Sequence, residues 1–181
     1  MTMRKTIRRL LAHAALGFAL VACHKDVLVP TRDKGAPVQT DATTYVLVRD
    51  GVGWRTSIAF EFRNIALDTL YIVNCDRATQ VALEQQGGGS WSTFWSPVVQ
   101  LCLSSPIVIP PGATYTDTLS VWGAEPGHNV IPEFPSTDLD GVYRVVWNNV
   151  VLHYGTGPQG FGTPAPMQFR YSNAFRLLRA N

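Results

Sequence analysis

The segment 55–63 alternates strictly between two kinds of side chain, and this alternation constrains the fold more than any other feature of the sequence. Ile58, Phe60 and Phe62 fall on one side, and small, polar or charged residues stand between them. Successive side chains of a β-strand point to opposite faces of its sheet, so the pattern predicts a half-buried antiparallel strand.

Short β-rich runs of the same kind continue from about residue 43, separated by Gly, Pro, Asn and Asp. Gly87-Gly88-Gly89 predicts a hairpin turn, and Pro110-Pro111-Gly112 predicts a sharp stop. Asp117 falls on the apolar side of its strand, so either that face is incompletely buried or a bulge shifts the register. We expect no amphipathic helix of about ten residues or more after Cys23. The further predicted strands are 44–48, 69–75, 81–85, 90–95, 107–109, 114–122, 141–147 and 150–154, with one or two more within 167–178.

About seven to nine short antiparallel strands at regular spacing predict an all-β sandwich or barrel. Residues 140–145 resemble the tyrosine corner of immunoglobulin-like domains, which implies that the Tyr143 hydroxyl bonds to backbone upstream of its strand. Val145 stands where antibody domains carry a cysteine, and the Cys–Trp–Cys pattern of antibodies is missing. We therefore expect an immunoglobulin-like β-sandwich over residues 43–181, outside the close antibody family.

Several segments resemble uncharacterised bacterial envelope lipoproteins with a single immunoglobulin-like domain. The resemblance covers about residues 43–178 and implies a fold without a known activity. The matching segments are Asn64 with Thr69-Leu70-Tyr71, Pro110-Pro111-Gly112, Gly141-Val142-Tyr143-Arg144 and Ser172-Asn173-Ala174-Phe175.

The chain begins with a basic segment, residues 1–9, followed by an apolar run from Leu10 to Ala22 that only His13 interrupts. This run is shorter than the roughly 20 residues that a helix needs to span a bilayer. It has the length of the apolar region of a signal peptide. An uncleaved short anchor and an ordinary secretory signal remain alternatives.

Leu20-Val21-Ala22-Cys23 resembles the lipobox of bacterial lipoproteins. The resemblance implies removal of residues 1–22 and lipidation (diacylglyceryl and palmitate-type acyl chains) of Cys23. Two or more acyl chains suffice for stable anchoring in a membrane. His24 stands where an Asp commonly signals inner-membrane retention, which favours the outer membrane of a bacterial envelope. Residues 23–42 are rich in polar residues and contain Pro30, Gly35 and Pro37, so we expect a flexible tether.

The formal net charge of +2 comes from the leader. Four of the 15 Lys and Arg residues lie in residues 1–9, and all 13 acidic residues lie beyond Cys23. The remaining chain is slightly acidic and has no basic cluster to neutralise phosphates, which argues against a nucleic-acid partner.

With Cys23 assigned to lipid, Cys75 and Cys102 remain as an even pair in an oxidising compartment. A disulfide between them would remove loop entropy worth roughly 3–4 kcal/mol. Two buried free thiols and a metal pair are the alternatives, and no CxxC spacing or neighbouring His supports the metal.

Motifs of hydrolases, zinc enzymes and nucleotide-binding enzymes cannot be found in the chain, so we expect a non-enzymatic protein without a cofactor or metal. Trp91, Phe94 and Trp95 lie close together and either cap the core or form an exposed stacking surface for a glycan or a protein. The expected function is an interaction or structural role of a membrane-anchored lipoprotein, with an envelope protein or glycan as partner. A proteinase inhibitor with a protruding loop at 155–166 and a glycan-binding accessory module are the alternatives.

Overall fold

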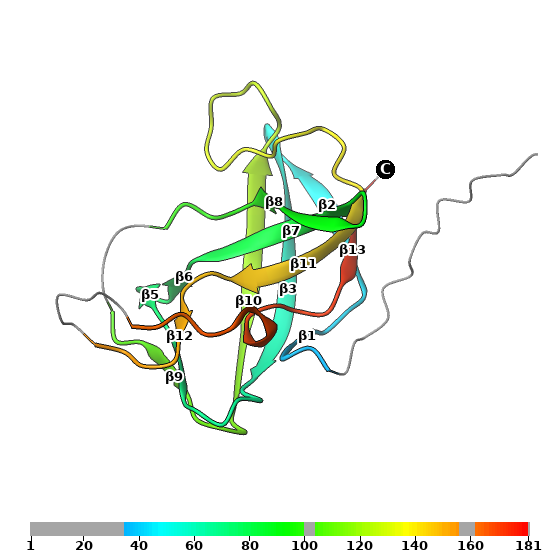
Figure 1. Cartoon of the computed structure of the whole chain (residues 1–181). Helices are drawn as coiled ribbons and strands as arrows, with labels where there is room; N and C mark the ends of the chain where they lie inside the picture. Colours follow the sequence, from blue (N-terminus) through cyan, green and yellow to red (C-terminus); the bar gives the residue numbers. More distant parts are fainter. Residues whose placement is uncertain (1–34, 100–103, 156–161, 181) are drawn as a thin grey trace, which may run out of the picture.

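The computed structural model describes residues 35–99, 104–155 and 162–180, and within these ranges the protein is an all-β sandwich (Figure 1). One 3₁₀ turn, η1 (Met167–Phe169), is the helical element of the described residues. The strands are β1 Val38–Thr40, β2 Thr44–Asp50, β3 Gly53–Arg63, β4 Leu70–Ile72, β5 Asn74–Cys75, β6 Ala78–Thr79, β7 Val81–Gly87, β8 Ser90–Trp95, β9 Ile107–Ile109, β10 Thr114–Ala124, β11 Gly141–Trp147, β12 Val150–Val151 and β13 Phe175–Arg179.

One layer is centred on β3, which pairs with β1 and the end of β2 along one edge and with β10 along the other. The second layer has the order β2, β13, β11, β7, β8, and its strands β7, β8 and β11 cross in front of β3 and β10 in Figure 1. Two packed sheets of this kind match the architecture of an immunoglobulin-like sandwich. A small sheet of β12, β4 and β9 and a β5–β6 hairpin lie beside the two layers.

Strand β2 belongs to both layers. Its first half, from Thr44 to Leu47, pairs in parallel with β13, and its second half pairs antiparallel with β3. The prediction of purely antiparallel strands is therefore corrected at this one pair. The pairing of β2 with β13 joins β13 to the hairpin of β2 and β3.

The alternation in 55–63 is confirmed: Ile58, Phe60 and Phe62 are buried. The rings of Phe60 and Phe62 lie 4.8 and 5.6 Å from the ring of Trp147, which reaches them from β11 in the opposite layer. Burial of such aromatic side chains supplies a large share of the hydrophobic stabilisation of a small core.

The tyrosine corner is present. Tyr143 is fully buried, and its hydroxyl donates to the carbonyl oxygen of Leu139 at 2.9 Å, four residues upstream. The side-chain amide of Gln85 donates to the same hydroxyl at 3.0 Å. The hydrogen bond between Tyr143 and Leu139 holds the segment that connects β10 to β11 against the sheet.

The Gly87–Gly89 hairpin is also present, and Gly88 and Gly89 have φ angles of 58° and 82°. Both values lie in the left-handed region that a two-residue hairpin turn of this type requires. The stop at Pro110-Pro111-Gly112 forms a turn in which Gly112 has φ 75°.

Several elements differ from the predictions. The expected strand 69–75 divides into β4 and β5, and the expected strand 150–154 contracts to β12. Residues 167–169 form η1 instead of a strand. Strand β1 lies inside the expected tether 23–42 and pairs with β3, so the ordered domain begins before residue 43.

We predict that Tyr143→Phe lowers the free energy of unfolding by about 1–3 kcal/mol, because the variant leaves the buried Leu139 carbonyl without its donor. Urea denaturation measures this value. Tyr171→Phe, on the outer face of the same layer, serves as the control and should change stability by less than about 0.5 kcal/mol. Equal effects of the two substitutions would contradict a stabilising role for the corner.

Candidate functional site

A β-bulge in β8 determines which side chains of the aromatic cluster Trp91, Phe94 and Trp95 are buried. Leu83 pairs with Trp95 while Glu84 pairs with Thr93, so β8 has one extra residue at this point. The extra residue breaks the alternation, and both Phe94 and Trp95 are buried.

Phe94 and Trp95 belong to the core. The ring of Phe94 lies 5.8 Å from Phe134 and 5.3 Å from Tyr143, and the Trp95 indole donates to the Trp122 carbonyl at 2.8 Å. These two residues therefore cap the core and are not available as a stacking surface.

Trp91 lies on the outer face of the same layer, where the Arg144 guanidinium stacks over its ring. The Arg144 guanidinium lies 4.6 Å from the centre of Trp91 and 5.0 Å from that of Tyr171, and it forms an ion pair with Glu84 at 2.6 Å. A cation between two rings is a stabilising arrangement. The contact fixes Trp91 against β11, and we assign it a structural role.

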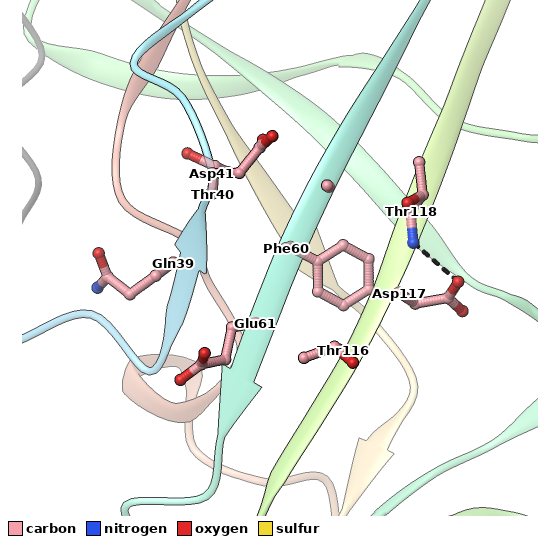
Figure 2. A pocket seen from close by; sticks show the side chains of 9 residues that line it. Gln39, Thr40, Asp41, Phe60, Glu61, Thr116, Asp117 and Thr118 are labelled. Carbon is pink, nitrogen blue, oxygen red and sulfur yellow. Dashed lines mark hydrogen bonds between the residues drawn. The ribbon is translucent and has the colours of Figure 1, made fainter.

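A hollow lies on the outer face of the other layer, across β1, β3 and β10 (Figure 2). Its volume is about 710 Å³. Register places Gln39, Glu61 and Thr116 in one row, and Ala59 lies opposite Thr118 in the next. The hollow exists because the Ala59 side chain is small, and polar side chains line the hollow around Ala59.

Asp41 borders this hollow, and hydrogen bonds fix both its carboxylate and the backbone of the preceding residue, Thr40. The Tyr45 hydroxyl donates to Asp41, and the backbone N–H of Thr40 donates to the Asn173 side chain at 2.7 Å. Burial, followed by the hydrogen bond to Asp41, raises the pKa of Tyr45 to about 12. The phenol therefore stays protonated and positions the Asp41 carboxylate at the rim.

The opposite side of β10 carries a second cavity of about 260 Å³. Leu119, Phe60 and Val81 form its apolar part, and Arg77 and Asp117 its charged part. The Tyr115 hydroxyl donates to Asp117, and burial together with this carboxylate raises the pKa of Tyr115. The register of β10 with β3 is continuous, so Asp117 is explained by an incompletely buried face and the bulge alternative is wrong.

The two cavities make the middle of β10 the candidate functional site. Carboxylates flank it on both sides: Asp41 and Glu61 on the outer face, and Asp117 on the inner. Such a surface suits a partner with hydrogen-bonding groups and positive charge. The site was not predicted from the sequence, because residues 39 and 41 fell in the expected tether. The alternation of Thr114, Thr116 and Thr118 was the available signal.

The remaining predicted residues lie partly outside the described ranges. Cys75 is disulfide-bonded, whereas Cys102, its predicted partner, and Cys23 lie outside the described residues, as does the middle of the 155–166 loop. The described residues contain no group of three His, Cys, Asp or Glu side chains placed to hold a metal ion. None of their helices is long and apolar enough to cross a membrane.

Comparison with known proteins adds no family assignment. No protein-family model matches the chain, and no curated protein matches it significantly.

We predict that stability falls as the pH rises from 10 towards 12, because Tyr45 ionises near its usual pKa of about 10 in the unfolded chain and near 12 in the folded one. The contribution is fully present below pH 10. Tyr45→Phe should reduce the loss between pH 10 and 11 by about 1 kcal/mol, measured by urea denaturation. The difference between wild type and variant should be constant from pH 7 to 9, and an equally constant difference up to pH 11 would refute the coupling.

Proposed function

We propose that this chain is an envelope lipoprotein, anchored through Cys23, whose immunoglobulin-like sandwich has a non-enzymatic task and binds another component of the envelope. The proposal of a lipid anchor rests on the order of segments in the first 23 residues of the chain: a basic segment, a short apolar run, and Leu20-Val21-Ala22-Cys23. The polar, acidic site around the middle of β10 supports a binding role for the domain.

The length of the connecting segment limits where the partner lies. Strand β1 begins at Val38, 15 residues after Cys23. A fully extended chain of this length spans at most about 50 Å. A lipid on Cys23 therefore keeps the domain within about 50 Å of its bilayer, and the partner is expected in this layer of the envelope, with the outer membrane favoured.

The anchor is tested by labelling cells with an alkyne analogue of palmitate. We expect label on the wild-type chain and none on Cys23→Ser. Cys102→Ser is the matched control and should keep the label. Label that persists on Cys23→Ser would rule out this anchor.

The binding role is tested by cross-linking in intact cells. We expect a discrete, saturable adduct with the wild-type chain. A control protein with the same residues 1–34 joined to an unrelated domain should give none. Equal adducts from both proteins would show that the anchor alone causes the contact, and turnover of a substrate that one point mutation abolishes would contradict the non-enzymatic role.

A further inference from the structure

Within the described residues, strand β10 is paired along one edge, and the other edge is open in its N-terminal half. It pairs with β3 over its whole length, and no other described strand pairs with it. In an antiparallel pair, alternate residues direct both backbone groups towards the partner strand, and the residues between them direct theirs away. The described residues show which set faces outward.

The even-numbered residues of β10 face the open edge. The Ala124 N–H donates to the Pro132 carbonyl and the Ala124 carbonyl accepts from Phe134, both at 2.9 Å. The Trp122 carbonyl accepts from the Trp95 indole at 2.8 Å. These contacts cover the C-terminal third of the edge.

The edge from Thr114 to Ser120 is open within the described part of the chain. One of its groups is occupied, because the Thr118 N–H donates to the Asp117 carboxylate at 2.8 Å (Figure 2). For Thr116 and Ser120, no described residue supplies a backbone partner. A row of unpaired N–H and C=O groups of this kind is a template for another strand.

The surroundings of this edge specify the chemistry of such a strand. The 260 Å³ cavity lies beside it, lined by Leu119 and by Pro97, Val98 and Val99 of the neighbouring segment. A side chain that points inward from an added strand would enter this cavity. Opposite Asp117, a basic side chain would form a favourable cross-strand pair.

We propose that the open edge of β10 binds an extended peptide segment of a partner protein, with a basic residue opposite Asp117 and apolar residues two positions away on either side. This inference rests on the proposed binding role and names its surface and the class of its partner. Backbone hydrogen bonds to Thr116 and Ser120 hold the segment, and the cavity and the carboxylate select its side chains.

A second copy of this chain fits the edge less well. Two β10 strands paired antiparallel and centred on the open stretch would place the two Asp117 side chains opposite each other. Like charges in directly opposed positions destabilise a pair of strands.

The test uses the blocked peptide Thr-Val-Thr-Lys-Thr-Val-Thr, whose palindromic sequence fits either strand direction. Its binding to the full chain in detergent is followed by fluorescence anisotropy. We expect saturable binding that Thr116→Pro weakens at least about tenfold, because proline removes the outward N–H without removing a bond to β3. Thr116→Val keeps this N–H and should bind within about twofold of wild type.

Two further arms keep the test independent of the folding of the proline variant. A peptide N-methylated on the residues that face β10 should not bind the wild-type chain. Replacing the peptide's Lys by Glu should weaken binding about two- to fivefold, and Asp117→Asn should abolish that preference.

Equal binding of the methylated and unmethylated peptides, or no binding of either, would overturn the inference. A wild-type dimer in sedimentation that Thr116→Pro converts to monomer would also overturn it, by assigning the edge to a second copy. The cross-linked adduct in cells tests the proposed function separately: if it persists while the peptide does not bind, only the assignment to β10 fails.

Discussion

The contact of Trp147 with Phe60 and Phe62 joins the two layers of the sandwich, and the rest of the arrangement follows from it. With Phe60 and Phe62 turned inward, alternation turns Ala59 and Glu61 outward. The pairing of β3 with β10 then places Thr116 and Thr118 beside them on the same outer face. The polar hollow therefore follows from how the core is filled, and the outward row of backbone groups on β10 follows from its pairing with β3.

The same register explains why one long strand carries two environments. The C-terminal part of β10 is enclosed, because Val121 is buried and Phe134 packs against Gly123 so closely that a side chain at this glycine would collide with the ring. The N-terminal part is exposed from Thr116 to Thr118. Rigid packing at one end positions an accessible edge at the other, which suits a binding site built on a strand.

The sequence predicted most of the fold, because alternation and turn residues act locally. Phe60 and Phe62 defined the buried face of β3, Gly88 and Gly89 the hairpin, and Tyr143 its corner bond. The bulge that buries Phe94 together with Trp95 depends on pairing with β7, and no local pattern encodes it.

The candidate site was harder to predict from the sequence for the same physical reason. Its residues come from β1, β3 and β10, and Gln39 and Glu61 are neighbours only through strand pairing. Asp117 was recognised as anomalous on an apolar face, yet its two bonds, from Tyr115 and the Thr118 N–H, appear only in three dimensions.

Amide hydrogen exchange along β10 measures whether the edge in its N-terminal half is open. We expect the N–H groups of Thr116 and Ser120 to exchange at least about 100-fold faster than those of Asp117 and Leu119, which face β3. Comparable protection of all four N–H groups would show that another segment covers this edge and that the edge is not open.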